Sequence, residues 1–223
     1  MDFEENIKKL SVELPEYVRI VVVSKTRTHE EIMKVYSTGH RVFGENRVQE
    51  LVTKKEALPD DIEWHMVGHL QSNKVKYIAP FISLIHSVDS ARLLKTISKE
   101  ALKNNRVIDC LLQVHIAREE SKFGFSEEEI TELFASYLAE DYPGIRICGL
   151  MGMATFTGDE NLIRSEFRYL AELYERTGKS FLNKPDYFNE LSMGMSGDYL
   201  IAVEEGSTMV RVGSLVFGER SGN

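Results

Sequence analysis

Residues 18–27, VRIVVVSKTR, indicate how the whole chain is built. Residues 20–23 are apolar and mostly β-branched, which is typical of a parallel strand that is covered on both faces. The apolar run ends abruptly in a polar tetrapeptide that contains Lys25. We therefore predict a buried strand over residues 19–24 that places a lysine at its C-terminal tip.

Seven further segments share this short, apolar and β-branched character. They span residues 41–44, 64–68, 84–88, 108–115, 146–151, 187–192 and 208–213. Helical patterns precede and separate the predicted strands, over residues 2–13, 28–38, 89–104, 126–140 and 161–177. Thr28 is a predicted N-cap, and Ser126 with Glu129 forms a predicted capping box.

Eight strands that alternate with helices predict one α/β domain over residues 1–223. Its fold is a single (β/α)₈ TIM-type barrel with an extra N-terminal helix. An open doubly wound sheet is the alternative. Against it, no G-x-G-x-x-G motif follows the first predicted strand, and the sequence holds no G-x-x-x-x-G-K-[ST] motif.

Composition and charge restrict the class of protein. The net charge of −8 argues against a general nucleic-acid or anionic-membrane binder. No apolar run approaches the roughly 18 residues of a membrane span, and the acidic N-terminus lacks the features of a signal peptide. Cys110 and Cys148 lie inside apolar segments, so we predict buried thiols in a reducing cytoplasm. The histidines show no metal-binding spacing, and we expect no metal.

The last two predicted strands end in residues that suit a phosphate. Barrels often bind phosphate with the loops after strands seven and eight. Ser192 offers a hydroxyl, and Gly213 and Ser214 offer backbone N–H groups. Ser196 is the predicted N-cap of a helix over 197–204. Two ordinary glycine-rich turns remain the alternative interpretation.

Lys25 acquires a chemical role in this context. A lysine at the end of a barrel strand is partly desolvated and near other cations, which lowers its pKa and makes its amine nucleophilic. With a phosphate site across the mouth, the simplest substrate is a phosphorylated aldehyde bound as a Schiff base, and pyridoxal 5′-phosphate (PLP) fits. An ordinary solvated lysine is the alternative.

Several longer motifs carry a family resemblance. The segments are VVVSKT, GHRVFGENRVQE, WHMVGHLQSNK, REESKFGF, GLMGMA and ELSMGMSGDYLIAVEEGSTMVRVGSLVFGER. They resemble the pyridoxal phosphate homeostasis proteins (the YggS/PROSC family), in the same order and over nearly the whole chain. That family is similar to the N-terminal barrel domain of alanine racemase. One departure is His115, where the family usually has asparagine.

The resemblance implies a role for individual residues. Lys25 would form the Schiff base with PLP, and Arg211 would face the pyridine nitrogen. Asn46 would lie near the ring, and Met153 would occupy the position of a ring-packing histidine in alanine racemase. Ser192, Gly213 and Ser214 would hold the phosphate. Four methionines lie at the predicted strand ends, namely Met151, Met153, Met193 and Met195. They would either form an apolar wall for the ring or fill the core.

These features favour a cofactor carrier over an enzyme. A guanidinium beside the ring nitrogen disfavours its protonation, and an unprotonated pyridine is a poor electron sink. The chain ends shortly after the eighth predicted strand, so we expect no partner domain to supply a second base. Tyr36, Tyr199 and His69 are the alternatives for that base.

We therefore expect intracellular PLP homeostasis by a cytoplasmic monomer, with PLP-dependent apoenzymes as recipients and without contact to nucleic acid or membrane. The first alternative is a single-domain PLP-dependent amino-acid racemase or related enzyme. The second is a barrel enzyme that uses Lys25 on a phosphorylated metabolite without PLP.

Overall fold

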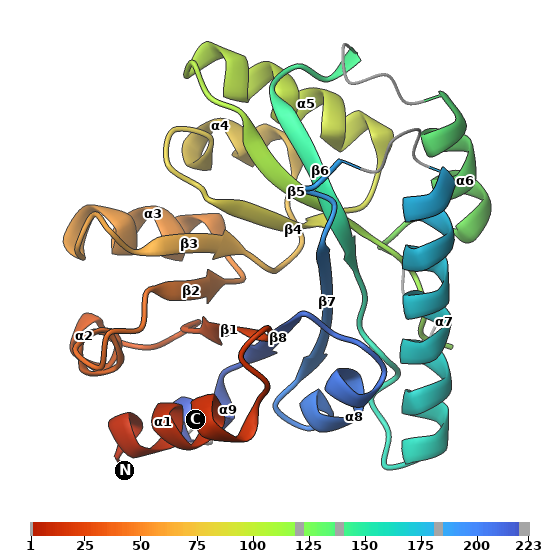
Figure 1. Cartoon of the computed structure of the whole chain (residues 1–223). Helices are drawn as coiled ribbons and strands as arrows, with labels where there is room; N and C mark the ends of the chain where they lie inside the picture. The colour runs from red at the N-terminus through yellow and green to blue at the C-terminus, as the bar shows by residue number, and fades with distance from the viewer. Residues whose placement is uncertain (1, 119–122, 137–140, 181–184, 219–223) are drawn as a thin grey trace.

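Eight parallel strands close into a barrel in the computed structural model of the chain, which describes residues 2–118, 123–136, 141–180 and 185–218. Each strand pairs with the next along the chain, and the eighth pairs with the first (Figure 1). The strands are β1 (Arg19–Val23), β2 (Val42–Glu45), β3 (Glu63–Met66), β4 (Leu84–Val88), β5 (Ile108–Gln113), β6 (Ile145–Met151), β7 (Glu190–Met195) and β8 (Met209–Val212). The predicted barrel is confirmed.

Helices surround this ring of strands. They are α1 (Phe3–Glu13), α2 (His29–Tyr36), α3 (Val48–Ala57), a 3₁₀ turn (Ser72–Lys74), α4 (Val75–Ile78), α5 (Ala91–Lys103), α6 (Glu127–Ser136), α7 (Glu160–Ser180), α8 (Tyr199–Glu204) and α9 (Ser214–Phe217). The additional helix α1 lies beside α9 (Figure 1). The rings of Phe3 and Phe217 meet edge to face at 5.5 Å between centroids. No helix in the described ranges is long and apolar enough to cross a membrane.

The buried side chains form two layers. One layer packs between the outer face of the barrel and the helices, and Val22, Phe43 and Trp64 belong to it. The other fills the barrel interior and includes Val21 and Leu111. This division follows from the period of two along each strand, which sends alternate residues to opposite faces. A polar strand residue therefore lies inside the barrel only if it occupies one of the alternate positions that point inward.

The predicted helix starts at Thr28 and Ser126 are confirmed. The Thr28 hydroxyl accepts the Glu31 N–H at 3.2 Å, and the Glu31 carboxylate accepts the Thr28 N–H at 2.7 Å. Ser126 and Glu129 form the same reciprocal pair. In both places the sequence alone locates the helix start because the capping residues bond within four residues of chain.

The seventh strand differs from its prediction. We predicted it over 187–192, but β7 spans Glu190–Met195. The aromatic pair at 187–188 has a high strand propensity, yet Phe188 donates its N–H to the Pro185 carbonyl in a turn. Ser192 consequently lies inside the strand and not at its tip.

The predicted N-cap at Ser196 is wrong. Helix α8 begins at Tyr199, and Asp198 is its N-cap residue. The Ser196 hydroxyl instead accepts the Gly213 N–H at 3.2 Å. In the sequence, a serine between a strand and a glycine is typical of a helix N-cap. Here the hydrogen-bond partner of Ser196 is Gly213, which lies 17 residues further along the chain.

Candidate functional site

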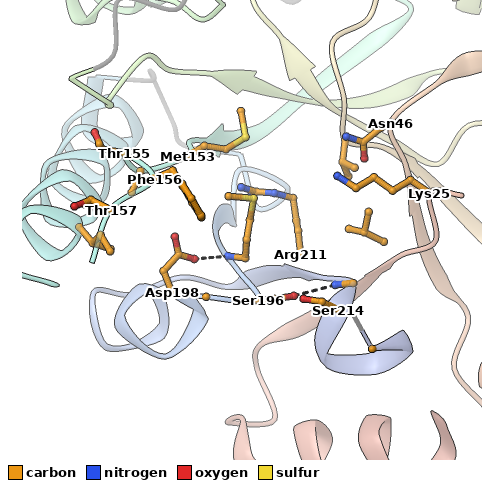
Figure 2. A pocket seen from close by; sticks show the side chains of 18 of the residues that line it. Lys25, Asn46, Met153, Thr155, Phe156, Thr157, Ser196, Asp198, Arg211 and Ser214 are labelled. Atoms are coloured by element: carbon orange, nitrogen blue, oxygen red, sulfur yellow. Dashed lines mark hydrogen bonds between the residues drawn. The ribbon is translucent and has the colours of Figure 1, made fainter. Parts of the chain in front are cut away.

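A cavity of about 420 Å³ opens at the C-terminal end of the barrel. Figure 2 shows Lys25 and Asn46 on one side, Arg211 in the centre, and the Ser196 and Ser214 turns below it. These residues follow β1, β2 and β7 or belong to the β8–α9 segment. Parallel strands deliver their C-terminal ends to one edge of a barrel, which is why residues distant in sequence share one cavity.

The backbone on both sides of Lys25 is held by side chains of α3. Lys54 donates from Nζ to the Ser24 carbonyl at 2.7 Å, and the Thr26 N–H donates to Glu50 Oε2 at 2.8 Å. Thr26 adopts φ 64°, a left-handed conformation that β-branched residues rarely take. Lys25, which directly precedes this kink, lines the cavity.

A buried ion pair lies behind this kink. Glu45 is fully buried, and its Oε1 accepts from Lys54 Nζ at 2.5 Å and from the Ser24 hydroxyl at 2.7 Å. Desolvation raises the pKa of Glu45, while the charge of Lys54 and its hydrogen bond oppose that shift. The pair, together with Ser24, connects α3 to the C-terminal ends of β1 and β2 next to Lys25.

Asn46 presents an acceptor that has no partner. Its Oδ1 is shielded from solvent and makes no hydrogen bond with any residue in the described part of the chain. The backbone of Asn46 is fixed by the end of β3, where a Cβ on Gly68 would come within 2.4 Å of the Asn46 carbonyl oxygen. A shielded amide without a partner is costly, so this position is suited to a ligand that donates or bridges a hydrogen bond.

Arg211 points into the barrel, while Val210 and Val212 belong to the outer layer. Its Nη1 donates to the Ser192 carbonyl at 2.9 Å and to the Ser192 hydroxyl at 2.6 Å, and its Nη2 donates to the Gly152 carbonyl at 2.9 Å. Burial lowers the pKa of Arg211 to about 10, which the negative charge of Asp198 partly opposes. A buried cation bonded only to neutral acceptors favours an anionic or strongly accepting ligand.

The turns after β7 and β8 meet at the lower edge of the cavity. The Gly213 N–H bonds to Ser196 Oγ, and α9 begins at Ser214. A Cβ on Gly213 would lie 3.1 Å from the Val23 carbonyl, so glycine permits the close approach of β8 to β1. The first N–H groups of a helix lack acceptors within it, and the Ser196 hydroxyl proton remains available for a ligand.

The charged and apolar groups on the wall suit a phosphorylated aromatic ring. Lys25, Arg27 and Arg211 carry positive charge, of which Arg27 is paired with Glu31 at 3.2 Å, and Asp198 is the one carboxylate on the described wall. Asp198 accepts the Met195 N–H at 2.5 Å, and desolvation raises the pKa of its carboxyl group. Apolar side chains, including those of Val67, Met153, Phe156, Ile163 and Met195, complete the cavity.

Most of the predicted site residues lie together. The cavity is lined by Lys25, Asn46, Met153, Arg211, Gly213 and Ser214. Ser192 and Met193 are fully buried and lie off its described wall, because β7 continues beyond them to Met195. Sequence reasoning missed the place of Ser196 and Asp198 on the wall. The signal that could have found both is their position in the loop directly after β7.

None of the three candidates for a second base is among the described residues that line the cavity. Tyr36 donates to Asp61 at 2.8 Å, and Tyr199 donates to Glu13 at 2.9 Å. His69 stacks on Phe123 with 3.9 Å between ring centroids. No tyrosine or histidine lines the cavity among the residues that the structure describes.

Comparison with known proteins places this barrel in a family. The family model described as alanine racemase, N-terminal domain, matches residues 2–221. The pyridoxal phosphate homeostasis protein of Aquifex aeolicus is 43% identical over 203 residues, which cover 91% of this chain and 87% of that protein. That of Synechocystis is 38% identical over 212 residues, covering 93% and 94% respectively.

Solved structures agree with these matches. PipY of Synechococcus elongatus, with PLP bound, superposes with a TM-score of 0.87 at 32% identity, covering 97% of this chain and all of that one. Alanine racemase of Bartonella henselae, 15% identical, superposes with a TM-score of 0.72 over 99% of this chain and 61% of that enzyme, which shows a shared fold. The architecture is therefore that of the alanine racemase N-terminal barrel. Within that class, the chain belongs to the family of pyridoxal phosphate homeostasis proteins.

Proposed function

We propose that this protein binds PLP in the cavity at the C-terminal end of its barrel, and holds the cofactor through Lys25 as a store for other proteins. The observation that carries the proposal is the convergence of Lys25, Arg211 and the Ser196–Gly213 turn on one cavity. The PLP-bound structure of the related PipY supports it.

Lys25 supplies the covalent link. Its amine would add to the aldehyde carbon of PLP, and one water would leave as the C=N bond forms. The step consumes no oxidant or reductant, and hydrolysis or attack by another amine reverses it. A reversible link is the chemistry that a carrier needs. The hydrogen bonds of the neighbouring Ser24 and Thr26 to α3 support this role, since they fix the backbone that carries the amine.

The phosphate is assigned to the turns after β7 and β8. The groups that would contact it are the proton of the Ser196 hydroxyl and the Ser214 N–H, while the Gly213 N–H, bonded to Ser196 Oγ, would orient that hydroxyl. The Ser192 hydroxyl is already bonded to Arg211 inside the barrel, so Ser196 takes the place that the sequence analysis gave to Ser192. The surplus of cationic groups over carboxylates on the cavity wall supports binding of a dianion.

Arg211 takes the position opposite the ring nitrogen. Arginine can only donate hydrogen bonds, so a ring nitrogen that faces it acts as an acceptor and stays unprotonated. Bound PLP supplies electron-withdrawing power, and an unprotonated ring supplies less of it. Met153 would pack against the ring, and Asn46 would form a hydrogen bond with it. This arrangement favours cofactor storage over strong carbanion chemistry.

The same reasoning extends to location and partners. The recipients would be PLP-dependent apoenzymes, and the carrier would act as a cytoplasmic monomer. Cys110 and Cys148 are free and buried, which is compatible with a reducing compartment. Sedimentation of the purified protein with and without PLP tests the monomer, and reactivation of an apoenzyme by the loaded protein tests delivery.

A spectroscopic titration tests the central proposal. We expect PLP to give a band near roughly 420 nm in the wild type and not in Lys25→Ala, because the imine conjugates with the ring. Lys76→Ala is the matched control, since Lys76 is an exposed lysine of α4 outside the cavity. An equal band in Lys25→Ala would contradict the proposal. Sustained racemisation of free amino acids would favour the enzyme alternative.

A further inference from the structure

A column of buried polar groups runs down the barrel interior from Arg211. The Ser192 hydroxyl accepts from Arg211 Nη1 at 2.6 Å and lies 3.0 Å from Nδ1 of His86. Nε2 of His86 lies 3.0 Å from Nδ1 of His65. His65 lines a second cavity, of about 330 Å³, which contains Arg19, Glu63 and other residues from the N-terminal ends of the strands. The column thus connects the two ends of the barrel.

The number of protons on each group determines which group donates and which accepts in every hydrogen bond of the column. Arginine has no acceptor, so Ser192 Oγ accepts from Arg211. The remaining hydroxyl proton needs an acceptor, and Nδ1 of His86 is the only other group that the hydroxyl contacts in the described ranges. His86 then carries its proton on Nε2 and donates it to Nδ1 of His65. The opposite direction would leave the Ser192 proton without an acceptor.

Both histidines are neutral, as this direction requires. His65 and His86 are buried, and burial lowers the pKa of His65 to about 3 and that of His86 well below its ordinary value. Each ring therefore carries one proton and can donate at one nitrogen while accepting at the other. A neutral column also avoids placing a second cation beside Arg211.

The hydrogen bonds that reach Arg211 determine how its guanidinium is placed. Three of its five N–H groups are used by the Ser192 carbonyl, the Ser192 hydroxyl and the Gly152 carbonyl. Because the Ser192 proton is directed to Nδ1 of His86, the rotation of the hydroxyl is fixed and a lone pair of Ser192 Oγ is held toward Arg211 Nη1. The planar guanidinium is then fixed, with its remaining N–H groups available to the cavity that Arg211 lines.

We infer that Ser192, His86 and His65 are positioning residues that orient Arg211 through a one-directional hydrogen-bond column. The inference deepens the proposed PLP function and rests on it for the role of Arg211 toward the ring. In the loaded protein, the column would keep Arg211 as a fixed donor to the ring nitrogen. Weakening the column would leave the lysine link intact and change the electronic state of the ring.

The direction of the column is testable without cofactor. We expect ¹⁵N NMR of histidine-labelled apoprotein at pH 7 to give His86 and His65 an unprotonated Nδ1 and a protonated Nε2. His86→Gln and His65→Gln spectra assign the two signals. A protonated Nδ1 on His86, or a doubly protonated ring at either position, would overturn the inference. This measurement stands even if PLP does not bind.

The positioning role is tested on the loaded protein. We expect Ser192→Ala and His86→Gln to bind PLP about tenfold more weakly, because a hydrogen bond to a charged group is lost or misdirected. The borohydride-trapped yield on Lys25 at saturating PLP should stay unchanged, while the absorption maximum and its pH dependence shift.

Ser207→Ala is the matched control. Ser207 is equally buried, and its hydroxyl bonds to the Met193 and Met209 carbonyls without touching Arg211. We expect this variant to keep the wild-type spectrum and an affinity within about twofold. If all three folded variants behave as wild type, or if Ser207→Ala shows the same spectral shift, the positioning role is wrong. Absence of a PLP spectrum in the wild type would instead refute the proposed function.

Discussion

At the scale of single residues, the conformation of Thr26 links the fold to the site. Thr26 has φ 64° in the turn that directly follows Lys25. Non-glycine residues in unfavourable backbone regions cost about 1–3 kcal/mol and persist when their surroundings hold them in place. The hydrogen bond from the Thr26 N–H to Glu50 provides such a constraint here. The strain thus accompanies the placement of the proposed cofactor lysine.

Relief of this strain gives a first prediction. Thr26→Gly should raise the free energy of unfolding by about 0.5–1 kcal/mol, because glycine adopts positive φ without a steric penalty and keeps the N–H bonded to Glu50. Urea denaturation measures the change. Asn105→Gly is the control, since Asn105 has φ 54° but asparagine tolerates this region. An equal gain at both positions would show that strain at Thr26 is not the cause.

The sequence predicts some cavity residues better than others. Lys25 lies two residues after β1 and Asn46 directly follows β2, so the end of each strand locates them within the C-terminal rim. The sequence points to Ser192 for the phosphate because the predicted strand ends three residues before β7 does. Ser196 was assigned to a helix cap because its partner, Gly213, is close only in space. Local patterns identify strand tips, but long-range hydrogen bonds decide which polar group faces the cavity.

At the scale of elements, the buried ion pair joins β1, β2 and α3. Lys54 and Glu45 have 6% and 0% exposed side chains, so removal of the Lys54 ammonium leaves the Glu45 carboxylate buried without a counter-charge. We expect Lys54→Met to lower the free energy of unfolding by about 3 kcal/mol. The double variant Lys54→Met with Glu45→Gln should lose less, because no uncompensated charge remains. Chemical denaturation of both variants tests this, and a larger loss in the double variant would contradict it.

The barrel itself is encoded element by element. Runs of apolar, β-branched residues predict strands wherever both faces are covered, as in β1 and β4. The apolar pattern does not predict the bounds of β7, because the aromatic residues that precede this strand form a turn in which Phe188 donates its N–H to the Pro185 carbonyl. The sequence alone does not decide whether Arg211 faces the barrel interior or the helices. The closed topology settles it, since the outer layer contains both of its neighbours.

At the scale of the whole molecule, the buried histidines make stability depend on pH. Burial lowers the pKa of His65 in the folded protein to about 3, from 6.5 for the unconstrained side chain. Below pH 6.5 the unfolded chain therefore binds more protons than the folded one, and the free energy of unfolding falls as pH falls toward 3. The slope from one such histidine reaches about 1.4 kcal/mol per pH unit. The contribution of neutral, buried His65 to the free energy of unfolding is therefore fully present above pH 6.5.

Comparison of variants isolates this contribution from that of the carboxylates. His65→Gln should flatten the dependence of unfolding free energy on pH between 6.5 and 4.5, whatever its effect at pH 7. His29→Gln replaces an exposed histidine and should leave the wild-type slope. Urea denaturation at several pH values gives both slopes. Equal slopes for wild type and His65→Gln would show that burial of His65 does not control acid stability.

The most direct test of the proposed cofactor site is chemical trapping of the link between PLP and Lys25. Borohydride reduction of the PLP-treated protein, followed by proteolysis and mass spectrometry, locates every reduced phosphopyridoxyl group. We predict one modified site, Lys25, with Lys54 unmodified because its amine is buried against Glu45 and the Ser24 carbonyl. Modification spread over exposed lysines, with no preference for Lys25, would contradict the proposed cofactor site.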